Sequence, residues 1–248
     1  MQTSELVDYT ERLLEVPRFR DYCPNGLQVE GRSETRRLAT AVTASLAVLR
    51  QAVAAGADSL LVHHGYFWKN EPSVVTGPRR ARLALLLGSD VNLIAYHLPL
   101  DAHPELGNNA ALAARLELRV EGWFGDQHIA AWGTPARPLT LGEFARSVEN
   151  RLARPPLVVG APERPLRRVA WCTGGAQDLL GDAVALGVDA FLTGEVSERT
   201  VHLSRETGVA FLAAGHHATE RYGVQALGAH LAERFGVEHF FLDEDNPA

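Results

Sequence analysis

The sequence predicts an α/β fold in which helices cover a largely parallel sheet. Three observations predict it: apolar strand-like segments alternate with helical segments, glycine closes helical segments, and part of the first half recurs in the second half. The chain has 248 residues, of which 46% are hydrophobic, so it is long enough for one large domain or two small ones.

The N-terminal region is expected to be a helix followed by a turn. Residues 4–15 place apolar side chains at the spacing of an amphipathic helix, and Ser4 is a suitable N-cap because its hydroxyl can accept a hydrogen bond from the first turn. The next stretch, 23–31, is rich in turn residues and contains an Asn-Gly step.

A regular strand–helix alternation follows. Three apolar runs are expected to be strands, and they cover residues 38–45, 59–62 and 91–97. The helix after the first strand is expected to close at Gly56, and a second helix is expected over 79–90, also ending in glycine. Strands that alternate with helices indicate a parallel sheet.

Residues 118–165 interrupt this alternation. They contain two strand-like segments around WFGD and HIAAWG, a helix near 141–153 and a proline-rich passage. We therefore interpret about 116–165 as an insert between a first repeat, about 1–115, and a second repeat, about 166–248.

The repeat is visible when the chain is shifted by 131 positions. Residues 36–64 then align with 167–195 without a gap, and ten of the 29 positions are identical, including a double arginine and an AVAxGxDxxL pattern. This predicts an internal duplication. In the alignment His64 occupies the position of Glu195, and a following H-x-x-x-acid step pairs His97 with His216.

Charge and composition exclude some classes of function. The net charge of −6 argues against a general surface for duplex nucleic acid, which needs a cationic face. No apolar run reaches the length of a membrane span, and the N-terminus lacks the pattern of a signal peptide. With only two cysteines and no disulfide framework, we expect a cytoplasmic protein.

Metal-binding side chains follow the predicted strands, and there are five of them: His63, His64, Asp101, His216 and Glu220. Ligands of parallel α/β sheets bind at the carboxyl ends of the strands. We expect the strand of His63 and His64 to stop at Gly65, so that both rings face one cavity. Two adjacent histidines suit two ions, with one ligand each, better than they chelate one ion.

The last two of these residues are four positions apart and share one face of a helix. Glu220 is our candidate for a carboxylate that bridges two ions. Imidazole and carboxylate ligands without thiolate suit zinc, iron, manganese or nickel.

For each of these side chains, a purely structural role is the alternative to metal binding. A histidine pair can be a hydrogen-bonded element of the core, and a His-x-x-x-Glu pair can be a solvated helix face. The aromatic residues 66–68 are interpreted as core. The CTGGAQ stretch, 172–177, could hold an anion through its N–H groups, or it could be a tight turn.

Five ordered motifs carry a family resemblance: VHHGYFWK, YHLPLDAHPELGNNA, CTGGAQD, FLTGE and AGHHATERYG. With them the chain resembles, over nearly its whole length, the GTP cyclohydrolase 1 type 2 homologue family. This dinuclear-metal family is related to the eukaryotic NGG-interacting-factor-three-like proteins.

The resemblance implies two intertwined, similar α/β domains in three layers, forming a single unit over 1–248, and assembly as toroidal homohexamers. It implies two divalent metal ions per subunit on the five residues named above, with Glu220 bridging. In the family pattern His64 and Asp101 bind one ion, and His63 and His216 bind the other. His97 and Glu195 are implied pocket residues.

Two functions are therefore considered. The first is a metal-dependent hydrolase of a small nucleotide or purine-like compound, in which Glu195 or His97 acts as a general acid or base. The second is a non-enzymatic role in metal binding or storage, or as a ring scaffold.

Overall fold

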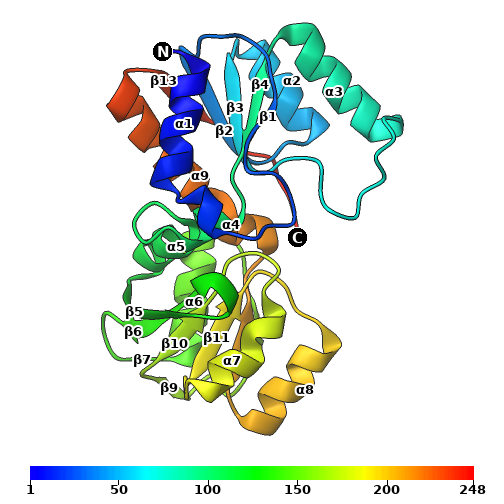
Figure 1. Ribbon diagram of the computed structural model, residues 1–248. Coiled ribbons are helices and arrows are strands. Elements are labelled where there is room, and N and C mark those ends of the chain that lie inside the picture. The colour runs from blue at the N-terminus through cyan, green and yellow to red at the C-terminus, as the bar shows by residue number, and fades with distance from the viewer. The chain divides into compact units, whose positions relative to one another are not determined.

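The computed structural model describes residues 1–248, and the chain divides into two compact units (Figure 1). The first unit comprises Met1–Leu100 and Val224–Asp245, and the second comprises Asp101–Gly223 and Asn246–Ala248. The chain passes between the units within two helices, α4 (Leu98–Ala102) and α9 (His216–Phe235). No helix combines the length and the apolar character needed to span a membrane.

The first unit contains a five-stranded sheet in the order β1-β4-β3-β2-β13. Strands β4, β3, β2 and β13 run parallel, and β1 pairs antiparallel with β4. The strand bounds are β1 (Gly26–Val29), β2 (Arg37–Thr43), β3 (Ser59–His64), β4 (Asn92–Ala95) and β13 (Glu238–Phe241). The helices of this unit are α1 (Thr3–Leu13), η1 (Val16–Arg18), α2 (Leu46–Ala54) and α3 (Gly77–Ser89), together with the C-terminal part of α9.

The second unit contains a six-stranded sheet in the order β5-β6-β10-β11-β12-β8. The central strands β10, β11 and β12 are parallel, and the outer pairings are antiparallel. The strands are β5 (Leu118–Phe124), β6 (Ala130–Pro135), β8 (Leu157–Val159), β10 (Val169–Trp171), β11 (Ala190–Thr193) and β12 (Ala210–Ala213), and a separate ribbon pairs β7 (Leu139–Thr140) with β9 (Pro165–Leu166). The helices are α5 (Asn108–Leu116), η2 (Asp126–His128), α6 (Leu141–Leu152), η3 (Gln177–Leu179), α7 (Leu180–Ala185) and α8 (Glu198–Thr207).

The predicted α/β architecture is confirmed, and so are the elements expected within 118–165. Strands β5 and β6 and helix α6 form there, and β5, β6 and β8 extend the second sheet on both sides with antiparallel strands. The second sheet is therefore mixed, because the three parallel strands at its centre are flanked by strands from this segment.

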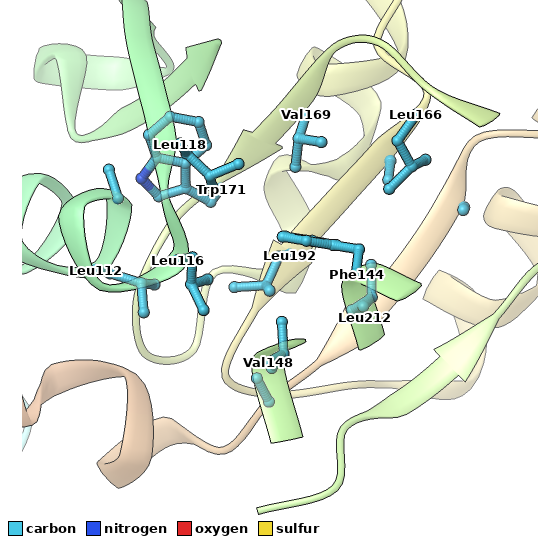
Figure 2. Packing of buried hydrophobic residues seen from close by; sticks show 14 of the residues in the cluster. Leu112, Leu116, Leu118, Phe144, Val148, Leu166, Val169, Trp171, Leu192 and Leu212 are labelled. Carbon is cyan, nitrogen blue, oxygen red and sulfur yellow. The ribbon is translucent and has the colours of Figure 1, made fainter. Parts of the chain in front are cut away.

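Helix α6 shows how the core of the second unit forms. Thr140 and Glu143 make a reciprocal capping box at its start, which satisfies N–H groups that the helix cannot pair itself. Its buried face carries Phe144 and Val148, which pack near Leu192 and Leu212 of the sheet (Figure 2). The spacing of four residues places the two helix side chains on one face.

An aspartate clamp recurs in both units. Asp58 Oδ2 accepts hydrogen bonds from the backbone N–H groups of Arg36 and Arg37, both at 2.9 Å. Asp189 Oδ2 accepts the corresponding bonds from the arginine pair before β10, at 2.7 Å and 2.9 Å. The strand registers also correspond: Leu38 faces Ser59 between β2 and β3, and Val169 faces Ala190 between β10 and β11. These are residues that the 131-position shift pairs. The duplication, its boundaries and the intertwined arrangement stay predictions.

Three local expectations need correction. Gln2, not Ser4, is the N-cap of α1, because residues 2–3 are already held by backbone contacts to residues 33–34. The stretch 23–31 contains a strand, β1, whose pairing with β4 overrides its turn-rich composition. Helix α3 passes through Gly88 and ends at Ser89, and its C-cap residue, Asp90, adopts the left-handed conformation in place of a glycine.

Two adjacent leucines of α3 test the packing of the first unit. Leu86 is 1% exposed and belongs to the core, whereas Leu87 is 61% exposed. Leu86→Ala is expected to lower the free energy of unfolding by about 2–5 kcal/mol, because it leaves a cavity. Leu87→Ala is expected to change it by less than about 0.5 kcal/mol. Urea unfolding of both variants measures the difference, and equal losses would show that α3 is packed differently.

Candidate functional site

The two adjacent histidines are the last residues of β3. This strand is two residues longer than predicted and stops at Gly65, as expected. His63 is fully buried, and its ring centroid lies 4.6 Å from that of His64. Gly65 leaves no room for a side chain, because a Cβ there would lie 2.7 Å from the Cβ of Ala95 and overlap Gln28. The glycine therefore allows close packing where the strand ends.

His97 adds a third imidazole in the first unit. It follows β4, and its ring centroid lies 5.1 Å from that of His63 and 5.8 Å from that of His64. Nitrogen atoms of the three rings lie within 4.8 Å of one another. The ring of Trp68 contacts His97 edge-on at 5.0 Å. A group of three imidazoles at this spacing could hold a metal ion.

Asp21 fixes the orientation of His97. Its Oδ1 lies 2.7 Å from His97 Nδ1, and its carboxylate also accepts from the N–H of Leu98 and the side chain of Asn25. Burial of this carboxyl raises its pKa, but hydrogen bonds and the charge of His97 outweigh burial and hold the pKa below its ordinary value.

Cys23 lies beside Asp21 and His97, with donor atoms of the three within 4.8 Å. Burial raises the pKa of the Cys23 thiol to about 12, and the charge of Asp21 adds to this effect. The thiol is therefore protonated at neutral pH, and thiolate is the form that binds metal. Because the Asp21 oxygens are also occupied by hydrogen bonds, this group has a structural role.

In the second unit, three glycines bring the ends of the parallel strands together. The N–H of Gly194 donates to the carbonyl of Gly174 at 2.8 Å, and the N–H of Gly215 donates to that of Gly194 at 2.9 Å. These bonds continue the sheet beyond β10, β11 and β12. A Cβ on Gly194 would lie 2.6 Å from both the carbonyl oxygen of Gly174 and the Cα of His216, so only glycine fits.

Two of these glycines are followed by charged side chains, Glu195 and His216. His216 Nδ1 forms a hydrogen bond with Glu195 Oε1 at 2.7 Å, and His216 Nε2 forms an ion pair with Glu220 Oε2 at 3.2 Å. Burial lowers the pKa of His216, but its interactions with the carboxylates of Glu220 and then Glu195 outweigh burial and raise the pKa to about 9. In the metal-free protein the ring is therefore protonated at neutral pH.

Asp101 is the second buried carboxylate of this unit. Its Oδ1 accepts from Asn108 Nδ2 at 2.9 Å and from Thr173 Oγ1 at 3.2 Å. Oxygen atoms of Asp101 and Glu220 lie within 4.8 Å of each other, and both residues are almost fully buried. Two carboxylates this close repel each other, and a cation would neutralise that repulsion.

One pattern is common to the four histidines described above, which are His63, His64, His97 and His216. In each ring Nδ1 faces an oxygen of its own unit, and these oxygens belong to Tyr96, Thr43, Asp21 and Glu195. The backbone carbonyl and the two carboxylates require Nδ1 to donate, which leaves Nε2 with the lone pair in the neutral ring. This is the arrangement that metal-binding histidines usually have.

Each unit thus contains part of the predicted ligand set. His63 and His64 belong to the first unit, and Asp101, His216 and Glu220 belong to the second. The two predicted acid–base candidates, Glu195 and His97, are each hydrogen-bonded at 2.7 Å to a partner of their own unit. Of the three aromatic residues interpreted as core, Tyr66 is buried and Trp68 is half-buried, but Phe67 is exposed.

The partners of these residues escaped the sequence analysis. Asp21 lies outside all five motifs, whereas Asn108 and Thr173 lie within YHLPLDAHPELGNNA and CTGGAQD, which were a usable signal. The CTGG stretch is a tight turn: the N–H groups of Thr173 and Gly174 donate to side chains of Asn109 and Thr219, so they are not available to an anion.

The chain is similar to curated proteins over its whole length. It is 56% identical over 248 residues to a GTP cyclohydrolase 1 type 2 homolog of Pseudomonas aeruginosa, covering 99% of this chain and 98% of that protein. It is 50% identical over 250 residues to the protein of the same name from Escherichia coli K12, with both chains fully covered.

Solved structures agree with this similarity. The structure of protein ybgI, described as of unknown function, has a TM-score of 0.97 and 50% identity, and a crystal structure of TTHA1606 from Thermus thermophilus has a TM-score of 0.92 and 36% identity; both matches cover 100% of each chain. Residues 1–247 match the family described as Duf34/NIF3 (NGG1p interacting factor 3). The chain therefore belongs to the Duf34/NIF3 family.

Proposed function

We propose that this protein is a metal-dependent hydrolase that acts on a nucleotide or purine-like substrate. In this proposal two divalent ions, from among iron, zinc, manganese and nickel, are held by five residues: His63, His64, Asp101, His216 and Glu220. The name of the similar proteins from Pseudomonas aeruginosa and Escherichia coli, GTP cyclohydrolase 1 type 2 homolog, supports a purine nucleotide as the substrate class.

The observation that carries the proposal is the shared orientation of the imidazoles. An oxygen faces Nδ1 of every histidine in the two clusters. For His63, His97 and His216 this oxygen can only accept, so that Nε2 is the nitrogen that can bind a metal ion. The donor set also fits, because imidazole and carboxylate without thiolate suit the ions named above. When bound, such ions act as Lewis acids and lower the pKa of water.

The remaining residues orient the ligands. Glu195 holds His216, and Asn108 and Thr173 hold Asp101 by donating to one of its oxygens. In this proposal His97, oriented by Asp21, transfers a proton to or from the substrate. The family resemblance also supports a toroidal homohexamer, and the low cysteine content without a disulfide framework supports a place in the cytoplasm.

A pair of glycine variants tests metal binding. Gly174 and Gly187 have similar left-handed φ angles of 69° and 66°, but a Cβ on Gly174 would overlap Glu220 Oε1, whereas a Cβ on Gly187 would have no neighbour within 4 Å. Both alanine variants carry the same backbone strain. Gly174→Ala is therefore expected to lower metal affinity by about tenfold or more, and Gly187→Ala to leave it unchanged.

Metal content after purification without chelators measures this difference. The wild-type protein is expected to hold two ions per chain. Fewer than one ion per chain in the wild type, or equal retention by Gly174→Ala and Gly187→Ala, would contradict the proposed ligand set.

The pKa of His216 predicts how metal affinity changes with pH. The ring must be neutral to bind a metal ion, and its pKa is raised to about 9 in the metal-free protein, so protons compete below that pH. Affinity is expected to rise by about tenfold per pH unit between roughly pH 7 and 9, the slope for one displaced proton, and to level off above. Competition with a chelator of known pH dependence measures the profile. A flat profile would show that His216 is not a ligand.

Turnover distinguishes the hydrolase from metal storage or a scaffold role. Protein loaded with iron, manganese, zinc or nickel is expected to hydrolyse GTP or a related purine nucleotide. Glu220→Ala is expected to lower kcat/KM by at least about 100-fold, because it removes a ligand, whereas Glu198→Ala changes a carboxylate that is 92% exposed and is expected to have no effect. Full metal loading without turnover above the metal-free protein would favour storage or a scaffold.

A further inference from the structure

The first unit contains a cavity that the proposed metal chemistry does not use. It has a volume of about 320 Å³ and lies between the segment 71–76 and the first turns of α3. This volume is within the range of small-molecule sites. Its walls include Tyr66, Pro72 and Val74, and its charged groups include Arg79 and Arg82.

Arg79 already has partners. Its guanidinium donates to the carbonyl of Pro72, lies 3.4 Å from the carboxylate of Glu71, and stacks over the ring of Phe67 at 5.3 Å. These contacts attach the segment 71–76 to α3 and neutralise one positive charge. Glu71 is the only acidic residue that lines the cavity, so no second carboxylate remains for Arg82.

Arg82 lies one turn further along α3 and, unlike Arg79, has no hydrogen-bonded or ion-paired partner. Its Nε is buried and makes no hydrogen bond, and it has no ion pair. Its guanidinium lies 5.8 Å from the centre of the Tyr66 ring, while the Tyr66 hydroxyl donates to the carbonyl of Ala44 at 2.7 Å. An arginine cannot lose its charge in a protein, so the buried Nε–H of Arg82 without a hydrogen-bond acceptor is unfavourable unless a ligand supplies one.

The start of α3 adds positive potential to the same cavity. Thr76 and Pro78 line it, the first turn contains no acidic residue, and the Thr76 side chain does not cap the helix. The free N–H groups and the dipole of a helix N-terminus favour an anion. Helix terminus and guanidinium together match a dianion with several acceptor oxygens.

We propose that this cavity binds a phosphate group, with the Arg82 guanidinium as its main partner and the apolar wall of Tyr66, Pro72 and Val74 beside it. The phosphate could be free or part of a small phosphorylated metabolite, since both present the same oxygens to Arg82. This proposal does not depend on the proposed hydrolase activity.

Two arginine variants of the full-length protein test the proposal. Arg82→Gln removes the cavity guanidinium, and Arg80→Gln removes an exposed arginine of the same helix, so both lower the net charge by one. Titration calorimetry with inorganic phosphate and with ribose 5-phosphate, at constant ionic strength, measures affinity. Arg82→Gln is expected to weaken binding at least tenfold and Arg80→Gln less than twofold. Arg82→Lys is expected to be intermediate, because it keeps the charge but loses the planar fork.

The thermal midpoint supplies a second measurement. Phosphate is expected to raise the Tm of the wild type and of Arg80→Gln, but not of Arg82→Gln. Without phosphate, Arg82→Gln is expected to fold at least as well as the wild type.

Glu220→Ala is expected to keep phosphate binding, which separates this cavity from phosphate bound to a metal ion. Tighter binding of ribose 5-phosphate than of phosphate would identify a phosphorylated metabolite, and equal binding would identify the free anion. Absence of millimolar binding, or equal losses in Arg82→Gln and Arg80→Gln, would overturn the proposal.

Discussion

The parallel pairing of β2, β3 and β4 is the constraint on which the histidine cluster of the first unit depends. Leu60 faces Ala39 on one side and Leu93 on the other, so the three strands end at one edge of the sheet. The end of β3 supplies His63 and His64, the residue after Tyr96 is His97, and the end of β2 supplies Thr43 as the partner of His64 Nδ1. Strand register therefore sets the spacing of the imidazoles.

A similar constraint acts in the second unit, where glycines follow the ends of three parallel strands and only their backbone groups meet. Hydrogen bonds among Gly174, Gly194 and Gly215 continue the sheet past β10, β11 and β12. The absence of side chains at these positions lets Glu195 and His216 approach to 2.7 Å. The buried carboxylate of Asp101 is oriented by two uncharged donors, which do not neutralise its charge, whereas the buried carboxylate of Glu220 forms an ion pair with His216.

Much of the fold could be predicted because local residue patterns determine many of its strands and helices. Apolar runs and closing glycines predicted strands and helices that the structure confirms, such as β3 and the helix that ends before Gly56. The prediction failed where a distant contact decides the conformation. Strand β1 exists because it pairs with β4, and the start of α1 is set by contacts to residues 33–34. Neither contact leaves a signal in the neighbouring sequence.

The sequence by itself determined the α/β class, the family membership and the residue types of the candidate ligands, because motifs such as VHHG and GHHATE combine a strand or helix signal with metal-binding side chains. Only the tertiary structure decided which nitrogen of His63, His97 and His216 can bind a metal ion. Asp21 reaches His97 and Glu195 reaches His216 across 76 and 21 positions of the chain, respectively. Hydrogen bonds between segments brought together by folding fix the orientation of a ring, and local residue patterns do not encode such pairs.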